Sequence, residues 1–111
     1  MKYKKFDVVI APFPFVDKVK KQKIRPSVIV SSNEYYQRTG LVVVAMITSA
    51  KNSKLWNDIK IINAEKSELS EGCVVRMKFS NIIDDKIIKK IGTIGKNEIA
   101  QLRNHLAKIF D

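Results

Sequence analysis

Most of the residue sets that enzymes commonly use for catalysis are absent from this 111-residue chain. Its single histidine, His105, and single cysteine, Cys73, provide neither a zinc-binding set nor paired histidines, and the chain has no glycine-rich phosphate-binding loop. Metal ions and nucleotide cofactors are therefore disfavoured. His105 lies beside an apolar helical stripe, and Cys73 begins an apolar strand, where a free cysteine behaves as a small hydrophobe. The adjacent Asp84 and Asp85 are typical of a turn rather than of a metal site.

Positive charge is the most distinctive property of the sequence. Twenty-one Lys and Arg residues against eleven Asp and Glu residues leave a net charge of +10. This excess favours an anionic partner, such as nucleic acid or an acidic protein segment, although scattered lysines also serve solubility alone. The densest cluster of basic residues comprises Lys18, Lys20, Lys21, Lys23 and Arg25.

The length of the chain leaves room for one hydrophobic core, so we expect one domain spanning residues 1–111. A single cysteine suits a reducing compartment. Asp7 and Pro12 interrupt the apolar residues that follow the basic N-terminus, unlike the core of a signal peptide. The longest uncharged apolar run, Leu41–Ile47, is far shorter than the roughly 20 residues that cross a bilayer. We therefore expect a soluble cytoplasmic protein with no membrane partner.

Short apolar segments dominate the first three quarters of the chain and predict β-strands. The predicted strands are Asp7–Ala11, Ser27–Ser32, Leu41–Ile47, Ile59–Ile62 and Cys73–Met77, and Phe79–Ile83 and Ile87–Ile94 supply shorter pieces. The uncharged, β-branched segment Leu41–Ile47 is predicted to be central and covered on both faces. Pro12–Phe15 predicts a bend, and the lysine-rich segment Val16–Pro26 predicts a long loop that acts as a lid or binding loop.

The last part of the chain changes to a helical period. Ile99, Leu102, Leu106 and Ile109 share one helical face, and Gly95 with Glu98 three residues later predicts the start of the helix. About six strands followed by one helix indicate a mainly β fold. We expect a small antiparallel barrel with a C-terminal helix.

Three segments occur in an order and spacing that resemble those of a known family. They are DVVIAPFPF (Asp7–Phe15), KIRPSVIV (Lys23–Val30) and AMITS (Ala45–Ser49), followed by Ile91–Gly92 and the amphipathic helix. Together they resemble the MazF/PemK family of bacterial toxin endoribonucleases from type II toxin-antitoxin systems, over nearly the whole chain. The family usually has Gly immediately before the first Asp, where this chain has Phe6, so the shape of that turn is left open.

The resemblance implies an SH3-like barrel that dimerises and cuts single-stranded RNA without a metal ion. It also implies a cognate antitoxin whose flexible acidic tail occupies the RNA groove. Arg25 and Thr48 match the catalytic positions of the family. In such cleavage the neighbouring 2′-hydroxyl attacks phosphorus, and the guanidinium and the hydroxyl contact the phosphate oxygens. The resemblance assigns proton transfer to Arg25 as well, but a guanidinium with a pKa above ~12 is a poor base at neutral pH, so we expect electrostatic stabilisation.

Single-stranded RNA is held by cations along its backbone and by aromatic faces under its bases. The lysine cluster is expected to provide the cations as a flap over the cleavage site. Phe15 and Trp56 are the aromatic candidates, although at least one of Phe13 and Phe15 is expected to pack inward and Trp56 is also suited to closing the edge of the core. Ser49 and Lys51 follow Thr48 closely enough to reach a bound phosphate.

The sequence is also compatible with two non-catalytic functions. Proteins that share this barrel include toxins that bind a DNA gyrase subunit and cleave nothing. A barrel with a basic loop also suits a passive RNA-binding module.

Overall fold

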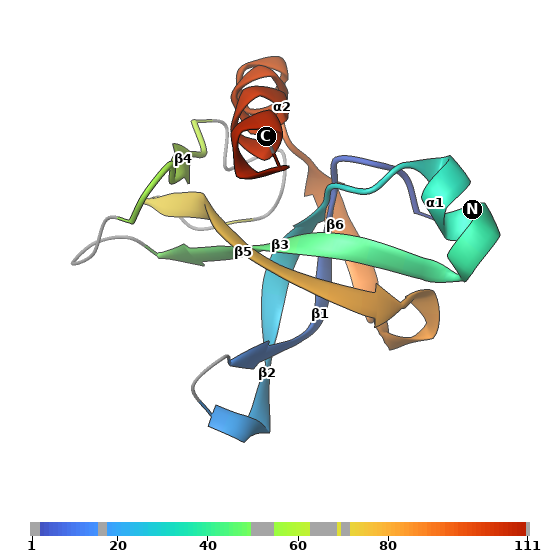
Figure 1. Ribbon diagram of the computed structural model, residues 1–111. Helices are drawn as coiled ribbons and strands as arrows, with labels where there is room; N and C mark the ends of the chain where they lie inside the picture. The colour runs from blue at the N-terminus through green and yellow to red at the C-terminus, as the bar shows by residue number, and fades with distance from the viewer. Residues whose placement is uncertain (1–2, 16–17, 50–54, 63–68, 70–71, 111) are drawn as a thin grey trace.

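The computed structural model describes residues 3–15, 18–49, 55–62, 69 and 72–110, with the side chains of residues 14–23 left out. The strands form one antiparallel sheet in the order β4-β5-β3-β2-β1-β6 (Figure 1). The elements are β1 (Asp7–Phe15), β2 (Lys18–Ile29), α1 (Asn33–Thr39), β3 (Leu41–Ser49), β4 (Ile59–Lys60), β5 (Cys73–Ile83), β6 (Lys89–Thr93) and α2 (Lys96–Phe110). The sheet curls into a half-barrel with a C-terminal helix, which confirms the predicted fold class.

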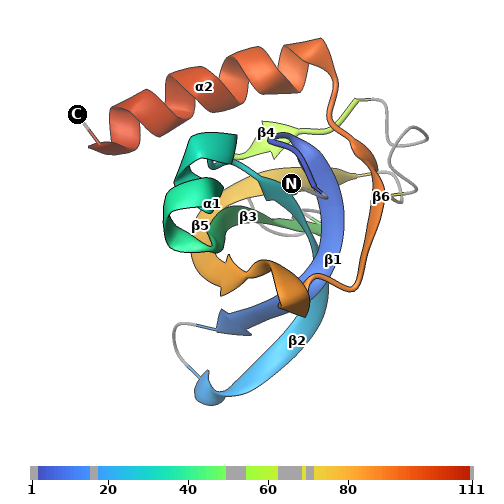
Figure 2. The same cartoon turned by 90° about the vertical axis from the view of Figure 1, so that its right-hand side faces the viewer.

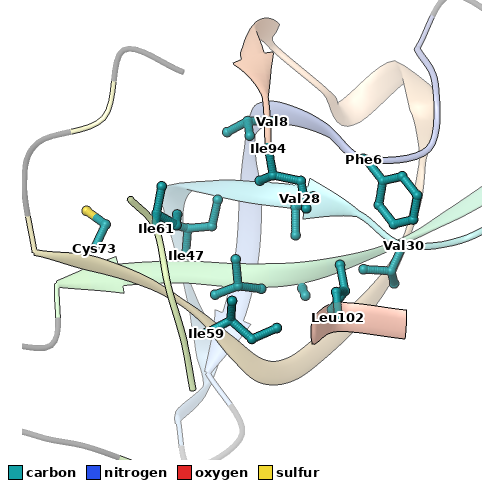
Figure 3. Close-up of a cluster of buried hydrophobic side chains, with 12 residues drawn as sticks. Phe6, Val8, Val28, Val30, Ile47, Ile59, Ile61, Cys73, Ile94 and Leu102 are labelled. Carbon is teal, nitrogen blue, oxygen red and sulfur yellow. The ribbon is translucent and has the colours of Figure 1, made fainter. Parts of the chain in front are cut away.

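Each face of the sheet has its own hydrophobic cluster, because side chains alternate along a strand. On the face that we call the α2 face, Leu102 of α2 is fully buried among strand residues such as Val28 and Ile59 (Figure 3). On the opposite face, the α1 face, Ile29 and Val44 belong to a second cluster against which Tyr36 of α1 packs. Helix α2 lies along one side of the sheet, and the β1–β2 hairpin extends away from it (Figure 2).

Strand β3 is central and buried on both faces, as predicted. Val42 and Val44 lie in the cluster of the α1 face, whereas Ala45 and Ile47 lie in the cluster of the α2 face. β-branched side chains suit a strand covered on both sides, since their restricted rotamers pack well on a pleated surface.

The predicted bend and lysine-rich loop are wrong for the described residues. Pro12 and Pro14 belong to β1, where they pair with Ile24 and Gln22, and β2 begins at Lys18. Proline is tolerated there because β6 pairs with β1 only from Asp7 to Ile10, so beyond that point the outer edge of β1 needs no N–H donors. The basic segment is therefore one arm of a β-hairpin.

Helix α1 was not predicted, because it is short and has no apolar stripe. Its ends are defined by local hydrogen bonds. Ser32 Oγ accepts from Tyr35 N at 3.1 Å, and Gly40 closes the helix with a left-handed backbone at φ 73°. Two predicted strand pieces also merge into the single strand β5, which is followed by a 3₁₀ turn at Asp84–Lys86, as the acidic pair indicated.

The start of α2 confirms the predicted cap. Gly95 N donates to Glu98 Oε1 at 3.0 Å, and the Glu98 carboxylate is buried. Ahead of β1, Phe6 has a left-handed backbone at φ 74° and a buried ring, over which the Arg103 guanidinium of α2 lies at 5.3 Å from the ring centroid. Among the described residues, no helix is both long and apolar enough to span a membrane.

Candidate phosphate-binding site

A row of residues at the same level of the sheet contains both predicted catalytic positions. Lys60 of β4 pairs with Val74 of β5, and Val74 pairs with Thr48 of β3. On the other side, Arg25 of β2 pairs with Ala11 of β1. We call these five residues the site row.

The register between β2 and β3 joins the two halves of the site row. The described pairing includes Val28 with Ala45 and ends with Ser27 opposite Met46. The described pairing ends there; continued by two residues, the same register would set Arg25 opposite Thr48 on the neighbouring strand. Neighbouring strands are about 4.8 Å apart, so two side chains on the same face at one level can contact the same small group.

Alternation puts Arg25 and Thr48 on the same face of the sheet. Arg25 lies two residues from Ser27 and four from Ile29, which is in the α1-face cluster, and Thr48 lies two residues from Met46 in that cluster. Both side chains are half-buried, so neither is sealed inside the barrel. The α1 face thus presents a guanidinium and a hydroxyl at the edge of an apolar floor.

The floor next to the site row includes the buried hydroxyl of Ser27. Ser27 is fully buried, and its Oγ has no hydrogen-bond partner among the described residues. The hydroxyl belongs to the adjacent level of the sheet, between Val9 and Met46.

The other predicted RNA-binding residues are distributed unevenly around the row. Ser49 is exposed at the end of β3, where it pairs with Cys73, so alternation assigns it to the α2 face rather than to the face of Thr48. Trp56 is 61% exposed in the turn before β4, so it does not close the edge of the core. Phe13 is buried and packs inward, as expected for one of the two phenylalanines.

The lysine cluster is placed by its backbone alone. Lys23 pairs with Phe13 and Lys18 with Phe15, so both belong to the β1–β2 hairpin that continues from Arg25. The side chains of Phe15, Lys18, Lys20, Lys21 and Lys23 lie outside the described part of the structure, as does all of Lys51.

Lys60 is a candidate that sequence reasoning missed. Its side chain is exposed. Its place in the site row follows only from the strand order, in which β5 lies between β4 and β3. The row therefore offers a second cation at about two strand spacings from Thr48.

Residues that sequence reasoning set aside lie elsewhere. Cys73 is buried on the α2 face, and His105 is half-buried on α2. The described residues contain no group of three or more His, Cys, Asp or Glu side chains suited to a metal ion. The donor set of the site row is instead cationic and hydroxylic, which suits a phosphate group.

Comparison with known proteins identifies the family of this chain. The family model described as PemK-like, MazF-like toxin of type II toxin-antitoxin system matches residues 4–110. No curated protein matches the chain by sequence. The chain belongs to the PemK-like, MazF-like toxin family of type II toxin-antitoxin systems.

Solved structures of low sequence identity share the fold. A mycobacterial endoribonuclease in complex with its cognate antitoxin has a TM-score of 0.73 at 15% identity, covering 96% of this chain and 92% of that chain. MazE-MazF from Deinococcus radiodurans has a TM-score of 0.72 at 16% identity, covering 97% and 95%. The Mycobacterium tuberculosis toxin MazF-mt6 has a TM-score of 0.71 at 22% identity, covering 95% and 96%.

Proposed function

We propose that this protein is a metal-independent endoribonuclease that cleaves single-stranded RNA at selected sequences, an mRNA interferase whose activity inhibits growth. Membership of the toxin family supports the proposal, as does the likeness to structures described as endoribonucleases. The observation that carries it is the β2–β3 register, which, continued two residues beyond its described end, would set Arg25 opposite Thr48 on the same face of the sheet.

The proposed reaction is an internal transfer of the phosphodiester. The 2′-oxygen forms a bond to phosphorus while the bond from phosphorus to the 5′-oxygen breaks. The 2′-hydroxyl loses its proton to water, and the leaving 5′-oxygen gains a proton from water. The products are a 2′,3′-cyclic phosphate and a 5′-hydroxyl.

Arg25 and Thr48 stabilise the charge that develops on the phosphorane. The guanidinium donates two parallel hydrogen bonds to phosphate oxygens, and the Thr48 hydroxyl donates a third. Fixed donors of this kind are effective because they need not reorient during the reaction. Since Arg25 supplies a permanent positive charge, stabilisation of the phosphorane does not require a metal ion.

The rest of the site binds the strand on either side of the cut. Lys60 extends the cationic row toward β4, and Lys18, Lys20, Lys21 and Lys23 do so along the hairpin. Trp56 and Phe15 stack on bases, and Lys51 contacts phosphates beyond Thr48. Ser49 is left out of this site, because alternation assigns it to the opposite face of the sheet.

The test is incubation of the pure protein with several long transcripts in EDTA. We expect site-selective fragments ending in 2′,3′-cyclic phosphate from the wild type and from Arg38→Ala, whose arginine is exposed on α1. Arg25→Ala should give little cleavage. If all transcripts stay intact, the nuclease proposal fails; retarded but uncut RNA then favours a passive RNA-binding module, and binding to gyrase a non-catalytic toxin.

We further propose a cytoplasmic homodimer inhibited by an antitoxin with a flexible acidic tail. An acidic segment and RNA phosphates would compete for the same lysines. Light scattering should give the mass of a dimer, and the cognate antitoxin should displace labelled RNA. A complex that holds RNA in the site row and the antitoxin tail together would refute this competition.

A further inference from the structure

A buried ion pair lies one level of the sheet away from the site row. Arg76 Nε donates to Asp58 Oδ1 at 3.2 Å, and Arg76 Nη2 donates to Asp58 Oδ2 at 2.9 Å. The Arg76 side chain is only 9% exposed, and the Asp58 side chain is only 2% exposed. Because Ile59 pairs with Val75, Asp58 and Arg76 face each other across β4 and β5, in the direction of the α1 face.

The same carboxylate closes the turn that precedes β4. Leu55 N donates to Asp58 Oδ2 at 2.9 Å, and Asp58 N donates to Leu55 O at 3.2 Å. Asn57, inside this turn, has a left-handed backbone at φ 57°, a conformation that asparagine tolerates better than most residues. The turn is therefore held by hydrogen bonds between its own residues, and Asp58 also connects it to Arg76 of β5.

Trp56 occupies the middle of this turn. It is the sole tryptophan of the chain and is 61% exposed. The backbone on both sides of it is held by hydrogen bonds, whereas its indole faces solvent. An exposed aromatic side chain on a fixed backbone loses little freedom when a base stacks on it, and base stacking contributes about 1–3 kcal/mol.

The stability of the fold does not explain the ion pair. Removing two charges from water is costly, and replacing a buried pair with apolar residues is often neutral or stabilising. An arginine with a two-point bond to a carboxylate does, however, fix the orientation of both groups. In a chain with a net charge of +10, this arginine is anchored to an acid rather than left to bind RNA.

We propose that Asp58 and Arg76 are positioning residues that hold the Leu55–Asp58 turn rigid, and so hold Trp56 as a preformed platform for a base of single-stranded RNA near the site row. The proposal rests on the proposed function for the identity of the ligand. The rigidity of the turn is a property of the free protein and is tested separately.

The test compares two double variants that each remove one positive and one negative charge. Asp58→Asn with Arg76→Met breaks the buried pair and leaves no unpaired buried charge. Glu34→Gln with Arg38→Met breaks an exposed ion pair on α1 and is the matched control. Circular dichroism checks that both fold. Arg76→Lys, which keeps the charge but not the two-point bond, serves in place of the first variant if that one does not fold.

The first measurement is the fluorescence anisotropy decay of Trp56 in the free protein. In the wild type and in the control we expect the decay to follow overall tumbling. In the Asp58/Arg76 variant we expect an additional fast component. An unchanged decay in that variant would overturn the proposal, whatever the protein does with RNA.

The second measurement uses a 2′-O-methyl RNA of about twelve nucleotides that spans a mapped cut site and cannot be cleaved. We expect it to quench Trp56 and to bind the Asp58/Arg76 variant about tenfold more weakly than the control. Cleavable RNA should show a raised KM, with kcat within about threefold of the wild type, because Arg25 and Thr48 are untouched.

The outcomes separate this proposal from the proposed function. A fall in kcat with KM unchanged would overturn the positioning role. If the wild type cleaves nothing, the nuclease proposal fails, and 2′-O-methyl-oligouridylate replaces the mapped sequence in the titration. If RNA then leaves Trp56 fluorescence unchanged, the platform is refuted, and the cognate antitoxin is the next partner to test at this turn.

Discussion

Arg25 combines a permanent charge with a half-buried position. A half-buried cation at the edge of an apolar floor acts on a phosphate through a lower effective dielectric than a fully exposed cation does. Lys60, in contrast, is exposed and carries a compact, strongly hydrated charge. At the scale of single residues, the two cations of the site row are therefore expected to contribute differently, one to the rate and one to binding.

Replacing Arg25 with Ala should lower the cleavage rate about 10²-fold or more, while RNA binding weakens less, because the guanidinium acts mainly on charge that develops in the transition state. Single-turnover rates at saturating RNA and dissociation constants for uncleavable RNA measure the two effects. Arg38→Ala is the control. Equal losses in rate and in binding would make Arg25 an anchor for RNA rather than a catalytic residue.

Replacing Lys60 with Ala should weaken RNA binding at low salt and leave the rate at saturation nearly unchanged. Each phosphate contact to a single strand contributes about 0.7 to the slope of log K against log salt, so the slope should flatten by about that amount. Lys108→Ala, on α2, makes the same change in net charge away from the site row. A slope equal to that of the control would remove Lys60 from the RNA-binding site.

The residues of the site row were predictable to different degrees. Arg25 and Thr48 were identified from their motifs, because those motifs are continuous in sequence. Lys60 reaches the same level of the sheet only through β5, which follows it in the chain, so no local pattern indicates its place in the site row. Asp58 and Arg76 are likewise brought together by strand pairing across a separation of 18 residues.

At the scale of elements, helix α2 and the sheet are joined by side chains from both ends of the chain. Leu102 is buried in the α2-face cluster together with Phe6, and the Arg103 guanidinium lies over the Phe6 ring. The backbone of Phe6 is left-handed, a conformation that destabilises most L-residues by roughly 1–2 kcal/mol. The ring and the backbone at this position therefore have opposite effects on stability.

Glycine should be tolerated better than alanine at position 6. Phe6→Ala should destabilise the protein by about 3–5 kcal/mol through loss of the buried ring. Phe6→Gly loses the same ring but relieves the backbone, so it should be more stable than Phe6→Ala by about 1 kcal/mol. Urea denaturation measures both. At Ala100, exposed inside α2, the order should reverse, with Ala100→Gly less stable than the wild type by about 1 kcal/mol.

Helix α1 is tied to the end of β5 by a tyrosine. Tyr36 Oη donates to Asp84 Oδ2 at 2.6 Å, and this hydrogen bond raises the pKa of Tyr36 above its ordinary value of 10.0, with smaller contributions from burial and from the charges of Asp84 and Asp85. The folded state thus favours the protonated phenol. The stabilisation is complete below the ordinary pKa and is lost as the pH rises through the raised pKa.

The urea midpoint of the wild type should therefore fall more steeply above about pH 10 than that of Tyr36→Phe, which has no phenol to ionise. Tyr35→Phe is the control, because the Tyr35 hydroxyl accepts from Asn81 rather than donating to a carboxylate. It should keep the steep fall of the wild type. Parallel curves for Tyr36→Phe and Tyr35→Phe would contradict this account of the Tyr36–Asp84 tie.

Helices and strands were predicted where the spacing of apolar residues in the sequence matches the faces that the fold buries. Strand β3 and helix α2 both have that property, and both were predicted. The basic arm of the β1–β2 hairpin was missed because its pairing comes from backbone hydrogen bonds to a proline-containing strand rather than from an apolar pattern. Helix α1 was missed because its caps, and not a stripe, define it.

At the scale of the whole molecule, the two faces of the sheet have separate roles. The α2 face carries the helix and a purely apolar cluster. The α1 face carries an apolar floor that ends at the site row and at the buried ion pair beside it. A net charge of +10 attracts anionic chains toward the molecule, and under the proposed function the site row is where a phosphodiester is cleaved.

The most direct test of this account removes a single oxygen atom from the substrate. An RNA containing one mapped cut site should be cleaved to a 2′,3′-cyclic phosphate and a 5′-hydroxyl, as read by mass spectrometry of the fragments. The same RNA with a 2′-deoxyribose immediately before the scissile phosphate should bind comparably and stay intact, because the attacking hydroxyl is missing. Cleavage of the deoxy-substituted strand, or fragments with 5′-phosphate and 3′-hydroxyl ends, would contradict the account.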